Sequence, residues 1–219
     1  MNKFKFLVLL LMASSCVEKS NSEVQTVHIK KQQTETQIAK QEVDSLKLDL
    51  ERSKLFWKGT KMRGAGSHEG EVRIIQGIML KDKNGLSGGK FEIDMKSISI
   101  SDIPITDPIP IKNLTDHLLH ADFFHVDNFP ISTFEITEII RHSTENLEIS
   151  GNLTIRGITK NITFSAIQKG NSISTRFLID RFDWNIAYEG SWADRTLVDR
   201  NIEFQIELVI VDFFPADMH

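Results

Sequence analysis

The strongest constraint on the fold is an alternation of apolar and polar residues that recurs through most of the chain after residue 45. Phe91, Ile93 and Met95 alternate with charged neighbours, so an extended strand here has one apolar and one polar face. The same period of two recurs in later segments, namely 134–137, 147–155, 162–166, 173–179 and 200–214. Strands that place one face on a core and the other in water carry this pattern. The chain is therefore predicted to be all-β.

One segment departs from the alternation and is predicted to be a short helix. Residues 113–120 carry leucine and histidine pairs at helical spacing, and Asn113 is a suitable N-cap. Pro104, Pro108 and Pro110 precede this segment and argue against a regular element there. The expected architecture is about eight antiparallel strands with one short helix, closed into a barrel that has no exposed edges.

The N-terminus has the pattern of a bacterial export signal. Lys3 and Lys5 precede the apolar residues 6–13, and two serines stand directly before Cys16. Small residues before a cysteine resemble the bacterial lipobox, although Ala13 stands where leucine is usual. The resemblance implies that residues 1–15 are a lipoprotein signal peptide and that Cys16 is acylated. The alternative is an ordinary signal peptide followed by a stray cysteine.

Residues 16–44 are predicted to be the lipidated N-terminus and a flexible tether. This stretch is rich in Gln, Glu, Lys and Thr, and its apolar residues follow no sustained period. A flexible chain of about 28 residues would reach roughly 30 Å. The alternative is that part of it forms a first strand or helix of the domain, which is expected to occupy residues 45–219.

Composition excludes several classes of protein. With 26 basic and 30 acidic residues the net charge is −4, and no basic run offers a nucleic-acid surface. A single cysteine excludes a disulfide scaffold and a cysteine-rich metal site. The longest apolar run, residues 6–13, is too short to span a bilayer. A hydrophobic content of 40% is sufficient for a core.

A series of short motifs runs in a fixed order through residues 45–211. They are SHEG at 67–70, GGKFEIDM at 88–95, HL at 117–118, DFF at 122–124, FP at 129–130, TF at 133–134, GNLTIRGITK at 151–160 and RFDWNI at 181–186. In this order and spacing they resemble the YceI-like lipid/polyisoprenoid-binding family. Trp184 departs from the family, which usually has glycine at that position.

The resemblance implies an extended lipocalin-like barrel of eight antiparallel strands that holds a polyisoprenoid or similar long amphiphile in its apolar bore. Such a ligand requires no catalytic group, so the protein is predicted not to be an enzyme and to need no cofactor besides a bound amphiphile. The candidate lining residues are Phe91, Ile93, Met95, Phe134, Ile136, Phe164, Trp184, Phe204, Ile206 and Leu208. If Trp184 points inward, it would shorten the bore.

Three polar residues are candidates for contact with a head group. His68 and His117 match family positions, and Arg156 would meet an anionic head if it lies at the mouth; loop geometry and solvent exposure are the simpler interpretations. His120 and His125 are predicted to be surface residues. No His-Glu-x-x-His or Gly-x-Ser-x-Gly pattern is present, so neither a metal site nor a serine nucleophile is predicted.

Together these patterns predict a lipoprotein of the bacterial cell envelope, anchored through acylated Cys16 and facing the periplasm. Its partners would be a lipid ligand and the membrane, with a homo-oligomer also compatible with the sequence. The alternative function is a non-catalytic envelope interaction module in which the same side chains fill the barrel.

Overall fold

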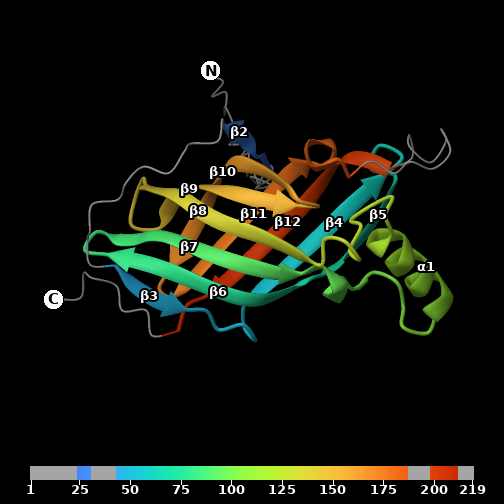
Figure 1. The fold of residues 1–219 in the computed structure, drawn as a ribbon, viewed down its shortest axis with the longest axis horizontal. Coiled ribbons are helices and arrows are strands. Elements are labelled where there is room, and N and C mark those ends of the chain that lie inside the picture. The colour runs from blue at the N-terminus through green and yellow to red at the C-terminus, as the bar shows by residue number, and fades with distance from the viewer. Residues whose placement is uncertain (1–23, 31–42, 187–197, 212–219) are drawn as a thin grey trace, which may run out of the picture.

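The computed structural model describes residues 24–30, 43–186 and 198–211. The predicted signal peptide and Cys16 lie outside these residues. The described chain forms one curled, almost entirely antiparallel sheet around an apolar interior (Figure 1). The all-β prediction is confirmed. The strands are β1 (Gln25–Thr26), β2 (His28–Lys30), β3 (Asp44–Lys47), β4 (Lys54–Lys61), β5 (Gly66–Glu71), β6 (Arg73–Asp82), β7 (Gly85–Asp94), β8 (Ile131–Arg141), β9 (Asn146–Ile155), β10 (Ile158–Lys169), β11 (Ser172–Asp180) and β12 (Val198–Val209).

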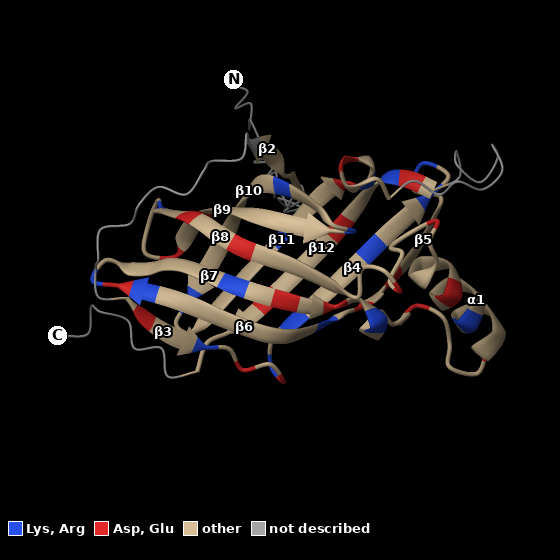
Figure 2. Cartoon of the chain, in the orientation of Figure 1, with Lys and Arg blue, Asp and Glu red and all other residues tan. Residues whose placement is uncertain are grey.

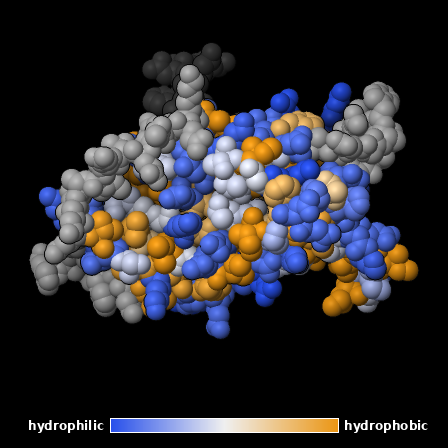
Figure 3. Space-filling model, viewed as in Figure 1, coloured by the Kyte–Doolittle hydropathy of each residue, from blue (hydrophilic) through white to orange (hydrophobic). Residues whose placement is uncertain are grey.

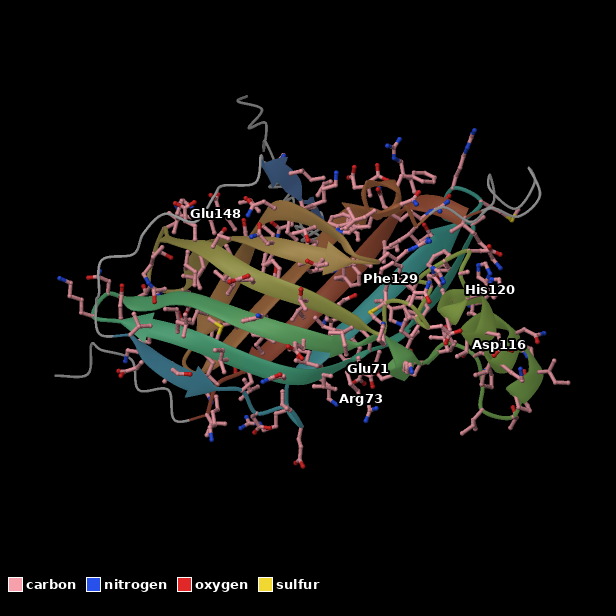
Figure 4. All side chains as sticks on the ribbon, in the orientation of Figure 1. Glu71, Arg73, Asp116, His120, Phe129 and Glu148 are labelled. Atoms are coloured by element: carbon pink, nitrogen blue, oxygen red, sulfur yellow. The ribbon has the colours of Figure 1, made fainter. Side chains whose placement is uncertain are left out.

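The two ends of the sheet are brought together by a break in one long strand. Along the sheet the order is β3-β6-β7-β8-β9-β10-β11-β12-β4-β5. Only Val72 separates β5 from β6, and its backbone N donates to Leu55 O of β4 at 3.0 Å. Figure 4 labels Glu71 and Arg73 on either side of this break. The chain therefore passes from pairing with β4 to pairing with β7 within a few residues.

The far end of the sheet is tied by the start of the domain. The strand β3 pairs with β6, and Leu48 forms an isolated bridge with Ile210 just after β12. Backbone hydrogen bonds from Asp49 N to Val209 O and from Val211 N to Lys47 O, both 2.8 Å, flank that bridge. Backbone contacts thus hold both edge strands of the curled sheet, β5 through the bond at Val72 and β3 through the bridge at Leu48.

The predicted count of eight strands is wrong, because the described residues form twelve. One additional strand arises where the break at Val72 divides a single run into β5 and β6. The other three are β1, β2 and β3, which lie before or at the predicted start of the domain.

Residues 24–30, which were assigned to the tether, belong to the sheet. The strands β10 and β11 pair with each other only near their turn, at residues 167–169 and 172–174. Beyond that point β2 pairs with β10, and β1 pairs in parallel with β11. The Gln25 amide both donates to Ser165 O and accepts from Ser165 N, at 2.8 and 2.7 Å, and Val27 is buried. This segment therefore fills the gap between β10 and β11.

The helix α1 (Pro108–Leu119) begins five residues before the predicted Asn113 cap. Its N-cap is Asp107, and Asn113 lies inside the helix. Proline is tolerated in the first turn, where backbone N–H groups have no intrahelical acceptor, so Pro108 and Pro110 start the helix instead of preventing it. The helix projects at one end of the sheet, called the α1 end below (Figure 1). In the described part of the chain, no helix has the length and apolarity needed to cross a bilayer.

Two short 3-10 helices, η1 (Met95–Ser97) and η2 (Arg181–Trp184), complete the α1 end. The Arg181 guanidinium is buried and donates to three backbone oxygens, those of Ile186, Val198 and Asp199, at 2.5–3.3 Å. Burial lowers the pKa of Arg181, and the nearby charge of Asp180 opposes that shift. This arginine ties η2 to the start of β12.

Gly151 lies where a side chain would collide with both backbone and core. A Cβ there would be 2.4 Å from Cζ of Phe134 and 2.7 Å from Glu135 O. A register shift between β8 and β9 lies beside Gly151, with the extra residue, Thr137, on β8. The missing side chain makes room for the Phe134 ring.

We expect Gly151→Ala to lower the free energy of unfolding by about 1–3 kcal/mol, because the backbone oxygen cannot move away easily. The matched control is Gly59→Ala in β4, where no atom lies within 4 Å of the added Cβ. That substitution should be neutral or stabilise by about 0.4–1 kcal/mol. Urea unfolding of the two variants measures both values, and equal effects would contradict the crowding at Gly151.

Candidate ligand-binding site

The curled sheet encloses an apolar cavity of about 110 Å³. Its walls come from every strand from β4 to β12 except β5, with Val72, Ile98 and Phe124 contributed by connecting segments. Among the lining residues in the described part of the chain, only Ser132 and Thr175 carry a hydroxyl and none carries a charge. An apolar, uncharged interior can hold a hydrocarbon chain.

Nine of the ten predicted lining residues line this cavity. They are Phe91, Ile93, Met95, Phe134, Ile136, Phe164, Phe204, Ile206 and Leu208. Their positions follow from the period of two, because alternate residues of a strand point to the same side of the sheet. Whether a ligand occupies the cavity is a separate question, taken up below.

Trp184 is the exception, since it does not line the cavity. It is fully buried in η2, and its indole N–H donates to Leu153 O at 3.1 Å. The family resemblance put Trp184 among the candidate lining residues, but the chain leaves β11 at Asp180 and turns into a 3-10 helix. The indole therefore packs at the α1 end instead of projecting into the bore.

Further lining residues were not predicted, and nearly all of them lie on β4, β6, β9 and β11. They include Leu55, Trp57, Ile74, Met79, Ile149, Leu153, Ile155, Ile162, Ile173 and Phe177. Most could have been found by extending the same alternation along each strand, as Ile162 is two residues from Phe164. Val72, Ile98 and Phe124 lie outside regular strands, so no periodicity indicated them.

A row of phenylalanine rings crosses the interior. The ring centroids are 6.3 Å apart for Phe91–Phe134, 5.7 Å for Phe134–Phe164, 4.5 Å for Phe164–Phe177 and 5.9 Å for Phe177–Phe204. These rings come from five strands, and that of Phe134 lies over Gly151 of β9, which has no side chain. All five rings line the cavity.

His68 is engaged at the outside of the sheet, on β5. Its Nδ1 lies 2.9 Å from Oδ2 of Asp102, while Oδ1 of Asp102 accepts from Glu69 N at 3.0 Å. Partial burial alone would raise the pKa of Asp102, but the hydrogen bonds from Glu69 N and His68, with the charge of His68, hold the pKa below its ordinary value.

This contact is one of several that hold residues 99–102 along β5. Ser99 N and Ser101 N donate to Glu71 O and Glu69 O, both at 2.9 Å. Gly70 permits the close approach, since a Cβ there would lie 1.8 Å from Ser99 O. His68 thus has the loop-holding role that was the simpler of its two interpretations.

Arg156 also holds backbone in place. It forms a tight turn with Gly157, both with positive φ, between β9 and β10. Its guanidinium donates to Phe123 O and Asn185 O at 2.6 and 2.7 Å. The predicted contact with an anionic head group is not supported by this placement, because both bonds go to loops outside the cavity.

The three other histidines considered in the sequence, His117, His120 and His125, lie in or just after α1. His117 is half-buried, with its ring 5.4 Å from that of Phe123, and it does not line the cavity. The exposed His120 pairs with Asp122 at 3.2 Å, and Figure 4 labels it at the α1 end. His125 is half-buried and packs edge-on against Phe129. No group of three or more His, Cys, Asp or Glu able to hold a metal occurs among the residues the structure describes.

The outer surface mixes both signs of charge. Figure 2 shows basic and acidic residues interspersed along the strands. Figure 3 shows hydrophobic residues at the tip of the α1 region, where Ile105 and Ile109 are 90% and 72% exposed.

Comparison with known proteins gives two kinds of match. The sequence model of the YceI-like domain matches residues 46–210. A UPF0312 protein of Enterobacter sp. (strain 638) is 46% identical over 50 residues, and Protein YceI of Salmonella arizonae is 44% identical over 50 residues. Each alignment covers 23% of this chain and 26% of the relative, so the matched stretch spans about a quarter of the relatives' length.

Two solved structures share the fold. BcnA of Burkholderia cenocepacia aligns with a TM-score of 0.57 at 21% identity, covering 74% of this chain and 98% of that one. A polyisoprenoid binding domain from Saccharophagus degradans, implicated in plant cell wall breakdown, aligns with a TM-score of 0.51 at 12% identity, covering 77% and 98%. At these identities the likeness concerns the fold.

The Asp102 contacts predict a pH-dependent contribution to stability. A lowered pKa means that folding favours the carboxylate, so its contribution is present above the unfolded pKa of about 3.9 and is lost as pH falls through the folded value. Asp102→Asn should lower the free energy of unfolding by about 0.5–1 kcal/mol at about pH 7 and have little effect near pH 2.5.

The matched control is Asp107→Asn, since the Asp107 side chain makes no capping hydrogen bond. Urea unfolding at the two pH values provides the comparison. An Asp102→Asn effect of equal size at both would show that the carboxylate charge contributes nothing.

Proposed function

The chain belongs to the YceI-like family, and from this premise we propose that it binds a polyisoprenoid or similar long amphiphile in the cavity inside its curled sheet. The observation that carries the proposal is an interior whose described lining residues are almost all apolar and include no charged side chain. Binding of a hydrocarbon chain there would be favoured by about 25 cal/mol for each Å² of apolar surface removed from water.

The size of the cavity constrains the shape of the ligand. An engineered protein cavity of about 150 Å³ holds one benzene molecule, so about 110 Å³ does not accommodate a long chain without movement of the lining. The five phenylalanine rings are in packing contact, with centroid separations of 4.5–6.3 Å, so a bound chain would require them to change rotamer. A flexible chain would demand less rearrangement of the wall than a fused ring system.

The proposed setting is the bacterial envelope. The basic, apolar and small-residue pattern of residues 1–16 supports export and acylation at Cys16, which would anchor the protein to a membrane facing the periplasm. An anchored binding protein beside a bilayer would carry or sequester an amphiphile without chemical change.

The small cavity also favours a second candidate function. If the phenylalanine rings do not move, the interior is simply a packed core, and the protein would be an envelope interaction module that acts through its outer surface. Ligand binding distinguishes the two.

The first test is native mass spectrometry of the chain carrying Cys16→Ser, gently purified from an exporting host. This substitution removes the chain's own acyl groups, while residues 24–30 stay in place between β10 and β11. We expect an added mass that extracts into organic solvent. A bare protein that also fails to retain tritiated geranylgeraniol would support the interaction module.

A pair of adjacent substitutions tests where the ligand binds. Ile206→Trp adds volume inside the cavity, whereas Gln205→Trp makes the same change on the exposed outer face of β12. We expect the first to weaken binding of tritiated geranylgeraniol at least about tenfold and the second to leave it unchanged. Circular dichroism confirms that both variants are folded, and equal affinities would place the ligand elsewhere.

A further inference from the structure

One buried hydroxyl in the cavity wall has no hydrogen-bond partner. Ser132 of β8 is 4% exposed and lines the cavity, on the same face of the strand as Phe134 and Ile136. Its Oγ is the single buried side-chain nitrogen or oxygen atom, among the described residues, that lacks a partner. Such groups are rare in folded proteins, because burying a hydroxyl unpaired costs free energy.

Other buried hydroxyls in this fold are satisfied. Ser53 Oγ accepts from Val209 N at 2.9 Å, and Ser150 Oγ lies 2.8 Å from Thr163 Oγ1. Thr175, which also lines the cavity, donates to Ser165 O at 2.7 Å. Ser132 is therefore an exception within a structure that pairs its buried hydroxyls.

Water is a poor partner for this hydroxyl. A buried water requires two to four polar contacts. The only other hydroxyl in the lining, that of Thr175, is already bonded to the backbone. An apolar ligand that carries one polar atom would be a better hydrogen-bond partner for Ser132 Oγ than water.

The position of Ser132 gives the cavity a polar end. Ser132 pairs with Ile93 and is three residues from Phe129, which Figure 4 labels at the α1 end. The opposite end is lined by Ile173 and Leu208, which face each other across β11 and β12.

We propose that Ser132 Oγ hydrogen-bonds an uncharged oxygen of the ligand's head group, such as an alcohol, ketone, ester or amide, with the hydrocarbon tail directed toward Ile173 and Leu208. The inference rests on the proposed function and specifies its ligand class. A diphosphate head is disfavoured, because none of the described lining residues carries a positive charge to compensate it.

The test uses Ser132→Ala and three twenty-carbon probes: geranylgeraniol, the hydrocarbon phytane and geranylgeranyl diphosphate. Tritiated geranylgeraniol is the reporter, and the others compete with it. The substitution should weaken geranylgeraniol binding about tenfold and change phytane competition by less than about twofold. In the unmodified protein the diphosphate should compete more weakly than the alcohol.

A stability measurement without ligand gives an independent readout. Ser132→Ala removes an unpaired buried hydroxyl, so it should raise the melting temperature. Ser53→Ala is the matched control: it leaves Val209 N without its acceptor, so it should lower the melting temperature and leave geranylgeraniol affinity unchanged. A rise in melting temperature for Ser132→Ala together with a fall for Ser53→Ala would be difficult to explain by nonspecific packing effects.

The outcomes distinguish a failure of the head-group assignment from a failure of the proposed function. If geranylgeraniol binds the unmodified protein and Ser132→Ala equally well, or if the diphosphate competes best, the head-group assignment is overturned while the proposed function stands. If none of the three probes binds the unmodified protein, the proposed function fails and the assignment fails with it.

Discussion

The structure depends on the register in which neighbouring strands pair. Because side chains alternate between the two faces, a slip of one residue would move a strand's apolar set to the outside. The register sets Phe91 of β7 opposite Phe134 of β8 and Phe177 of β11 opposite Phe204 of β12. Gly151 of β9 leaves the space into which the ring of Phe134 extends. The apolar lining of the cavity follows from this alignment.

The polar side chains of the α1 end serve the same interior indirectly. Arg156 and Arg181 direct their guanidinium groups to backbone oxygens, and Asp102 joins His68 to the backbone of β5. These contacts hold the segments that cover the end of the sheet, and none of these residues lines the cavity. These charged side chains thus lie outside the cavity, and its described lining is apolar except for the hydroxyl of Ser132 and the hydrogen-bonded hydroxyl of Thr175.

Much of the wall could be predicted from the sequence because alternation is a local property that each strand carries by itself. Nine lining residues follow from it. The errors occur where tertiary contacts override local pattern. Trp184 was included in the lining by the family resemblance but lies in η2, and α1 begins at prolines that appeared to exclude it. The pairing of residues 24–30 with β10 and β11 is non-local, and a Gln- and Thr-rich segment gives no hint of it. The unpaired state of Ser132 could not be predicted at all, since it depends on every atom around it.

Because residues 24–30 fill the gap between β10 and β11, the sheet does not resist force equally across its width. Pairing between β9 and β10 runs without interruption from Ile158 to Ile167, whereas the N-terminal segment is held by a few backbone bonds, the amide of Gln25 and one buried valine, Val27. Tension applied to the chain ahead of residue 24 would act on this weakest ladder first. Behind it stand the rings of Phe164 and Phe177, both in the cavity wall. A force on the N-terminus would therefore disturb the cavity wall first at β10 and β11, while β4 to β9 remain folded.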